Sequence, residues 1–597
     1  MKLSKFTVAL LGVLTSVSLY SVSFAKPTDV PVNPLPDALP TESPLPEATI
    51  SPAGASLEGN VALPDGSAQA SLESFWGQNG VLDANPFAFD ETAEAQEQLP
   101  NVDFFTALPG TLVADTHLYV NVINAVGTHE QILVQNVRGE DFLFLPANAS
   151  FSQMMFGYDP GIAVFIDNGE TMVLLEENIP VDVYPYLSKA DGNGVRKLNF
   201  TSIMSDGTMN NYSLNIMQSS NVPSMFIKSK DPVKKGLAYV YEIKGNKGEG
   251  DLDFVGADGA VIYSGSLTQI KGRGNSTWAA YKRPFQIKLG QSFDMLQTGD
   301  NANKSKTWIL LANAFDATLL RNTASFDMAK AMGVDAPDSR FTDLYFDGIY
   351  MGSYLLSEKV EEGKGRVNID KNGFLIEMDS AYYAQEDYYF VDAVGTPFVV
   401  KAPEEPNNLQ MQYITEYMNN AITAAANGGV NPNTGLSVWD YIDKDSLVKY
   451  YVLEELTKDP DAFVSSAFFY LPAGGKLVAG PAWDYDSSFG VVMLKNNNLS
   501  SGLMTKEGWI GYFLSLPDFN DAVKDFMKNT ASKIGYNELK IITSDSVLIE
   551  KSRKMNDMLW KGVDAKYYTL PSYKENLVYL KNFINKRVSY LSNNIGK

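Results

Sequence analysis

Residues 457–490 read Thr457-Lys-Asp459-Pro-Asp461, then Ala467-Phe-Phe-Tyr-Leu471, then Gly480-Pro-Ala-Trp483-Asp484-Tyr485-Asp486-Ser-Ser-Phe-Gly490. The apolar run in the middle predicts a strand, and Gly474-Gly475 predicts a turn that reverses the chain. The aspartates on either side are therefore expected to return towards each other. One carboxylate of such a pair can orient a hydroxyl nucleophile while the other holds a metal ion that bridges phosphates. An Asp-x-Asp sequence is also compatible with a structural Ca²⁺ site, and the residues alone leave both interpretations open.

A cationic block precedes this region. It reads Lys271-Gly-Arg273-Gly-Asn275-Ser-Thr-Trp278, followed by Lys282-Arg-Pro-Phe-Gln-Ile-Lys288-Leu289. The two glycines allow a ligand to approach the backbone closely, and the Lys and Arg side chains supply donors that match phosphate. Lys288 lies in an alternating run that predicts a strand, and a strand lysine after a glycine-containing turn suits nucleotide phosphates. A tight β-hairpin with a solvated cationic face explains the same residues.

The sequence Leu319-Leu-Arg321-Asn322 begins a predicted helix. Apolar residues at spacings of three and four place this helix at 317–332, and Gly333 closes it as a C-cap. An arginine near a helix N-terminus opposes the dipole preference, so Arg321 is expected to meet an anion or a carboxylate. A ligand contact and a structural salt bridge both satisfy that expectation.

The order of the predicted elements indicates the fold class. The runs Tyr350-Met-Gly-Ser-Tyr-Leu-Leu-Ser-Glu358 and Gly373-Phe-Leu-Ile-Glu377-Met-Asp379 each end an apolar strand with a carboxylate, and such ends often line a cleft. In the chain after the first 221 residues, strands come mostly first and helices mostly last, which is the order of an α+β fold. The expected strands are 224–227, 237–243, 285–289, 344–346, 352–356 and 374–378, and the expected helices are 317–332, 409–427, 444–457, 520–533 and 573–591.

The N-terminal part of the chain has a different composition. Lys2 and Lys5 precede an uncharged apolar run, and Ser23 and Ala25 place small residues at a cleavage site, so a secretory signal peptide is expected. An uncleaved membrane anchor is the alternative. A proline-rich acidic segment follows, and after it short strands separated by turn signals predict a sandwich whose closing strand resembles that of bacterial cadherin-like domains. The predicted parts are a signal peptide at 1–25, a Pro-rich linker at 26–98, an all-β sandwich at 99–221 and a mixed α+β domain at 222–597.

The composition excludes several classes of function. The 48 Lys+Arg against 70 Asp+Glu give 48 − 70 = −22, which argues against nucleic acid or an anionic membrane surface as the main partner. The chain has no cysteine and two histidines, His117 and His129, so thiol nucleophiles, thiolate zinc sites and iron–sulfur clusters are excluded. Chemistry later in the chain must use carboxylates, Lys, Arg, Asn, hydroxyls and hard metals. The mature protein is expected to be secreted or at the cell surface, with no stable membrane insertion after signal cleavage.

Taken in order, these blocks resemble the spore coat protein H (CotH) kinase family, from about residue 222 to the C-terminus. The resemblance implies an atypical two-lobe protein kinase that uses Mg-ATP to phosphorylate Ser or Thr of exported or coat proteins. Its partners would then be a nucleotide and exported protein substrates. By position in the motifs, the resemblance implies that Asp461 is catalytic and that Asp484 and Asp486 bind the metal. It implies a nucleotide-binding site in which Glu358 or Glu377 is the acidic partner of Lys288. The residues of that site are Arg273, Asn275, Lys288, Arg321, Glu358 and Glu377.

The motifs of ordinary kinases are missing. The sequence contains no Gly-x-Gly-x-x-Gly, His-Arg-Asp or Asp-Phe-Gly. The helix with Arg321 contains Asp327 but no glutamate, and Ser466 stands five residues after Asp461, where an ordinary kinase has its metal-binding Asn. An inactive kinase-like adhesion or scaffold protein is therefore one alternative. A glycoside hydrolase with paired carboxylates is the other, although the cationic block counts against it.

Overall fold

The fold is described from a computed structural model of the 597-residue chain. The structure describes residues 118–492, 498–560 and 569–596. All of these residues belong to one compact unit, Ser71–Lys597. The predicted signal peptide and proline-rich linker, together with His117, lie outside the described residues. Within the described ranges no helix is both long and apolar enough to cross a membrane.

Short strands build an N-terminal β-domain, as the turn signals predict. In β1, Val120 and Val122 are buried while Asn121 between them is not, which is the alternation of a strand with one face on a core. One sheet has the order β2-β1-β5 and the other β3-β4-β9-β8-β6-β7, with β4 and β9 parallel. The cadherin-like character of this domain stays a prediction. The strands are β1 Tyr119–Ile123, β2 His129–Leu133, β3 Gln135–Val137, β4 Glu140–Leu145, β5 Met155–Gly157, β6 Ala163–Asp167, β7 Met172–Leu174, β8 Arg196–Ile203 and β9 Met209–Gln218.

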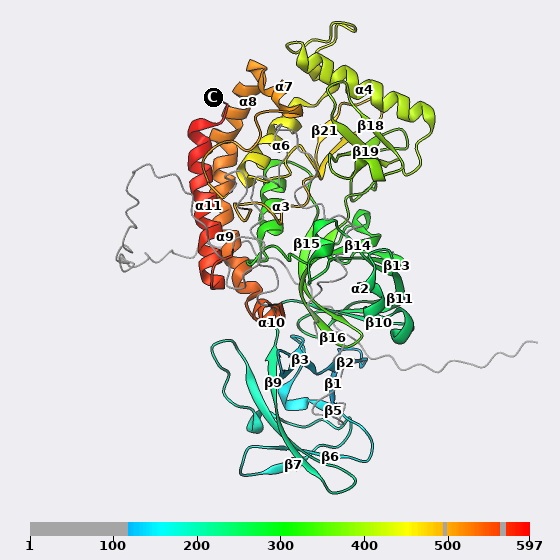
Figure 1. The fold of residues 1–597 in the computed structure, drawn as a ribbon, viewed down its shortest axis with the longest axis vertical. Coiled ribbons are helices and arrows are strands. Elements are labelled where there is room, and N and C mark those ends of the chain that lie inside the picture. The colour runs from blue at the N-terminus through cyan, green and yellow to red at the C-terminus, as the bar shows by residue number, and fades with distance from the viewer. Residues whose placement is uncertain (1–117, 493–497, 561–568, 597) are drawn as a thin grey trace, which may run out of the picture. The chain divides into compact units, whose positions relative to one another are not determined.

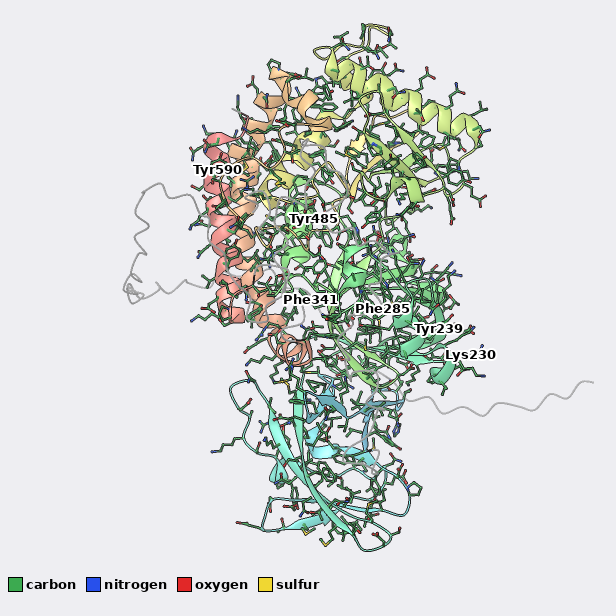
Figure 2. All side chains as sticks on the ribbon, in the orientation of Figure 1. Lys230, Tyr239, Phe285, Phe341, Tyr485 and Tyr590 are labelled. Carbon is green, nitrogen blue, oxygen red and sulfur yellow. The ribbon has the colours of Figure 1, made fainter. Side chains whose placement is uncertain are left out.

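A closed barrel follows, in the order β10-β11-β12-β13-β14-β16-β15 (Figure 1). The side chains of β13 alternate: Phe285, Ile287 and Leu289 are fully buried, whereas Lys288, between the last two, is exposed. Figure 2 labels Phe285. The alternating run therefore fills the barrel with its apolar positions and turns Lys288 outward. The strands are β10 Ser224–Ser229, β11 Lys247–Val255, β12 Val261–Gly272, β13 Phe285–Phe293, β14 Ser305–Leu311, β15 Ser339–Phe346 and β16 Ile349–Glu358.

The strand predicted over 237–243 is wrong, because this segment is the helix α2, Leu237–Glu242. Leu237, Tyr239, Tyr241 and Ile243 alternate as in a strand, but Leu237, Val240 and Tyr241 also share one helical face at spacings of three and four, and these three are the buried residues. A distant residue favours the helix, since the backbone N–H of Leu237 donates to Asp347 Oδ2 at 3.2 Å.

The C-terminal part combines a second sheet with most of the helices (Figure 1). The sheet has the order β18-β19-β17-β20-β21. The helix predicted over 520–533 is too short, because α8 continues through a π-helical segment, Met527–Ala531, into α9. The strands are β17 Phe374–Met378, β18 Tyr389–Val391, β19 Pro397–Ala402, β20 Ala467–Leu471 and β21 Val478–Ala479, and the helices are α1 Pro232–Lys235, α3 Arg321–Met332, α4 Asn408–Ala426, α5 Val438–Tyr441, α6 Lys444–Thr457, α7 Trp509–Leu514, α8 Pro517–Phe526, α9 Ser532–Leu548, α10 Glu550–Trp560 and α11 Tyr573–Asn594.

Local capping explains where several helices begin and end. Gly333 caps α3 in the left-handed conformation, with φ 76°, as predicted. The side chain of Asp443 accepts a hydrogen bond from the backbone N–H of Ser446 at the start of α6, and Lys458 ends that helix with φ 50°. With strands mostly before the helices, the chain is an α+β protein.

The hydrophobic core of the β-domain continues into the barrel. The amide of Gln135 makes two hydrogen bonds with the backbone of Tyr350, at 2.8 and 3.1 Å, and the hydroxyl of Tyr345 donates to the carbonyl of Phe144 at 3.2 Å. The predicted boundary between residues 221 and 222 is therefore crossed by packed side chains. The residues of the later part that share this core are Phe226, Val255, Tyr345, Tyr350, Met555 and Leu559.

Candidate active site

Buried carboxylates come together where α6 and the hairpin of β20 and β21 end. Asp459 and Asp461 follow α6, and the antiparallel pairing of β20 with β21 brings Asp484 back towards them, as the turn signals predict. Burial, followed by the charges of Asp484 and Asp379, raises the pKa of Asp461 to about 7. The negative charge of Asp484 acts on Asp461, as expected for two aspartates that the hairpin of β20 and β21 returns towards each other.

Asp484 is held in an unusual backbone conformation. Its φ is 68° and that of Ser466 is 53°, both in the left-handed region that non-glycine residues rarely adopt. The hydroxyl of Ser466 donates to Asp484 Oδ2 at 3.3 Å. Such conformations persist only where the surroundings enforce them, and they gather at functional sites. Ser466, at the position where an ordinary kinase has an Asn, thus orients the carboxylate of Asp484.

Arg273 is the cation that faces these acids. Its guanidinium lies over the ring of Trp483, with Cζ 5.3 Å from the ring centroid. Burial raises the pKa of Asp484 and Asp486, and the positive charge of Arg273 opposes that rise in both. Arg273 therefore belongs to the site, as the cationic block predicts.

The Leu-Leu-Arg-Asn block fixes the loop that carries Asp484. Asn322 Oδ1 accepts a hydrogen bond from the backbone N–H of Tyr485 at 2.9 Å, and Nε of Arg321 donates to the carbonyl of Ser488 at 3.0 Å. The guanidinium of Arg321 also forms a buried ion pair with Asp316. Arg321 thus meets a carboxylate, as predicted, but it acts as a structural support of the loop and does not face the site as a ligand.

Tyr485, which Figure 2 labels, connects its loop to the last turn of α6 through its hydroxyl. It donates to Glu454 Oε1 at 2.6 Å, and the backbone N–H of Phe489 donates to the carbonyl of Thr457 at 2.7 Å. Asp459, at the same end of α6, has a buried Oδ1 that accepts no hydrogen bond from any described residue. The loop with Asp484 is therefore fastened to both α3 and α6.

Glu377 lies in a second part of the site, beside residues that sequence reasoning missed. Its carboxylate pairs with Nζ of Lys401 at 2.9 Å, and the same Nζ lies 3.2 Å from Glu386. Burial, which the charge of Lys401 opposes and that of Asp379 reinforces, raises the pKa of Glu377 to about 7. The sequence signal that could have identified Lys401 is its position as the single lysine of the apolar strand Pro397–Ala402. Asp379 ends the Gly373–Asp379 block, but no role was predicted for it.

Three predicted residues lie away from these carboxylates. Lys288 is exposed on the outside of the barrel, because the apolar positions of β13 occupy the inside. Asn275 is exposed, and its Oδ1 accepts a hydrogen bond from Lys244 Nζ at 3.1 Å. Glu358 forms an ion pair with Arg366. The structure therefore does not support Glu358 or Glu377 as the partner of Lys288.

The carboxylates fit a metal site that is completed by phosphate and water, and they do not form a metal site made of protein side chains alone. No three acidic or histidine side chains in the described ranges converge closely enough to hold a metal by themselves. Mg²⁺ is usually bound by one or two carboxylates together with substrate phosphates and water. Asp484 and Asp486 supply two hard oxygen ligands whose negative charges repel each other and are opposed by the charge of Arg273, so they fit an ion that arrives with a phosphate group.

Comparisons with known proteins place the chain in a family. No curated protein matches it. One similar solved structure is a chain from the HipA, HipB and operator DNA complex of Shewanella oneidensis MR-1, with 13% sequence identity and a TM-score of 0.26. The match covers 51% of this chain and 63% of the HipA complex chain, so this protein spans less than two thirds of that chain's length. The Helicobacter pylori proinflammatory kinase CtkA is 10% identical over 54% of this chain and 92% of its own, with a TM-score of 0.21. Residues 270–591, more than half of the chain, match the family described as CotH kinase protein, and the protein belongs to that family.

Proposed function

We propose that the protein is a secreted atypical protein kinase that transfers the γ-phosphate of Mg-ATP to Ser or Thr of exported proteins. The observation that carries the proposal is the β20–β21 hairpin, which returns Asp484 towards Asp461, together with Arg273 stacked on the ring of the neighbouring Trp483. Membership of the CotH kinase family supports a kinase, and the signal-peptide pattern supports export.

The buried acids differ in the roles that their positions allow. Asp461 has a pKa of about 7, so its carboxylate can accept the proton of a substrate hydroxyl near neutral pH. Asp484 and Asp486 would hold Mg²⁺, and Arg273 would face the phosphate oxygens. When bound, Mg²⁺ supplies neutralisation of the charge on the phosphates. Phosphoryl transfer needs positioning and charge more than covalent participation, and a site without histidine or cysteine is adequate for it.

Two substitutions separate the roles of the aspartates. Asp461→Asn should keep Mg-ATP binding and lose transfer of label from γ-labelled ATP to casein by about a hundredfold or more. Asp484→Ala should lose Mg-dependent ATP binding itself, measured as a thermal shift. Asp521→Asn, which removes a carboxylate exposed on α8, is the matched control and should behave like the wild type. Wild-type activity in either of the first two variants would contradict the assignment.

The same experiment tests the inactive alternative. A thermal shift with Mg-ATP but no label on any protein would indicate a nucleotide-binding scaffold. If neither a thermal shift nor label is observed, the protein does not use the nucleotide. The adhesion-protein or glycoside-hydrolase interpretation would then be favoured.

A further inference from the structure

Lysines gather at the end of the barrel that carries Arg273. Lys247 opens β11 and Lys271 lies near the end of β12, and the strand register places them directly opposite each other. Directly opposite residues of neighbouring strands project from the same face, and like charges in that arrangement repel. Lys244 lies just before β11, and its Nζ reaches Asn275 in the turn after β12.

A fourth cation, Lys359, follows β16. Burial lowers the pKa of Lys271, and the positive charges of Lys247, Lys359 and Lys244 lower it further. We call these four residues the lysine patch. Nζ of Lys359 is held by Glu361 at 3.1 Å, but within the ranges that the structure describes neither Lys247 nor Lys271 forms an ion pair. Two directly apposed lysines without carboxylate partners therefore form a local cationic surface in a chain of net charge −22, and such a surface attracts anions.

The lysine patch adjoins the candidate active site without being part of it. Lys271 precedes Arg273 by two residues, and Arg273 is the cation that acts on the pKa of Asp484 and Asp486. Lys247 is exposed and Lys271 is half-buried, whereas Asp486 is buried. A buried centre suits a small nucleotide, and an exposed cationic surface beside it suits an anion carried by a larger molecule.

We propose that the lysine patch is a phosphate-binding subsite for residues of the protein substrate that already carry phosphate. This inference rests on the proposed function, since phosphorylated Ser or Thr is the product of that reaction. A phosphorylated residue carries about −1.5 to −2 charges and three acceptor oxygens at neutral pH, and each lysine offers three donors. A segment held in this way would present neighbouring hydroxyls repeatedly, so clustered Ser and Thr would be modified faster after the first transfer.

The test is a binding measurement without nucleotide, made on the full chain. Two fluorescent peptides of the same Ser-rich sequence are compared by anisotropy, one unmodified and one with a single phosphoserine. The wild type should bind the phosphopeptide about tenfold more tightly, and Lys247→Gln/Lys271→Gln should bind both peptides equally. Lys528→Gln/Lys533→Gln removes the same charge from exposed positions in the π-helical segment and at the start of α9 and should keep the preference. The preference should weaken as salt is raised.

Affinity for Mg-ATP, measured on the same variants, distinguishes the two sources of phosphate. The double variant at 247 and 271 should bind Mg-ATP like the wild type. Equal binding of the two peptides by the wild type, a preference that survives in the double variant, or a loss confined to Mg-ATP binding would each overturn the subsite. Phosphopeptide preference in a protein without transfer activity would support the subsite while refuting the proposed function.

Discussion

A buried glutamate of α9, the helix that packs against α3, makes the stability of the protein depend on pH. Glu538 is 2% exposed, and its Oε1 has no hydrogen-bond partner in the described part of the chain. Burial, and then the negative charges of Asp327 on α3 and Asp545 on α9, raise its pKa from 4.5 to about 9. The unfolded chain therefore releases this proton at a lower pH than the folded protein does.

The sign and size of the effect follow from this difference. Below pH 4.5 the group is protonated in both states and costs nothing. As the pH rises towards 9 the unfolded state ionises alone, and each pH unit lowers the free energy of unfolding by about 1.4 kcal/mol. Between pH 5 and pH 8 the loss amounts to about 4 kcal/mol. Glu538→Gln keeps the shape of the side chain and removes the titration, so the variant should gain stability relative to the wild type over this interval.

Urea denaturation followed by tryptophan fluorescence measures the effect. The stability of Glu538→Gln minus that of the wild type should be about 4 kcal/mol larger at pH 8 than at pH 5. Glu416→Gln changes an exposed glutamate of α4 and should show no such dependence. A difference between Glu538→Gln and the wild type that is equal at both pH values would refute the reasoning.

Two further substitutions test contacts around the site. Arg587→Met removes the partner of Glu455, whose carboxylate lies 2.7 Å away with both side chains fully buried, and should cost about 3–5 kcal/mol in urea denaturation. Lys524→Ala, in an exposed pair on α8, should cost less than about 1 kcal/mol, and equal effects of the two would contradict the role of burial. Asn322→Ala removes the acceptor for the backbone N–H of Tyr485. It should lower the free energy of unfolding by about 1–3 kcal/mol and abolish most transfer of label from ATP. Unchanged activity in Asn322→Ala would show that the loop needs no such support.

Elements with strong local signals were predicted well from the sequence. The helix expected at 444–457 coincides with α6, because Asp443 caps its start and apolar residues repeat through it. The strand expected at 374–378 coincides with β17, since a short apolar run leaves little choice of bounds. The segment at 237–243 failed because its apolar residues fit two periods, and a hydrogen bond to Asp347 selects the helix. A contact with a residue so distant in sequence leaves no local trace.

The residues of the candidate site likewise differ in how far local sequence signals could predict them. The return of Asp484 towards Asp461 could be predicted from the turn signals between them, whereas the roles of these residues and of Arg273 came from the resemblance to the family and stay predictions. Lys401 was missed because its ion pair with Glu377 depends on the register of β19 against β17, which the sequence does not reveal. Lys288 lies in a strand as predicted, but only closure of the barrel determines that its side of the strand faces outward.

The core that the β-domain shares with the barrel has an evolutionary consequence. Phe226, Tyr345 and Tyr350 of the barrel and Met555 of α10 are buried partly by the β-domain. A gene segment that begins at the predicted boundary would encode a catalytic part with an apolar surface open to water, where it would favour aggregation. The two parts can therefore be inherited together, or exchanged only for a partner that covers the same side chains.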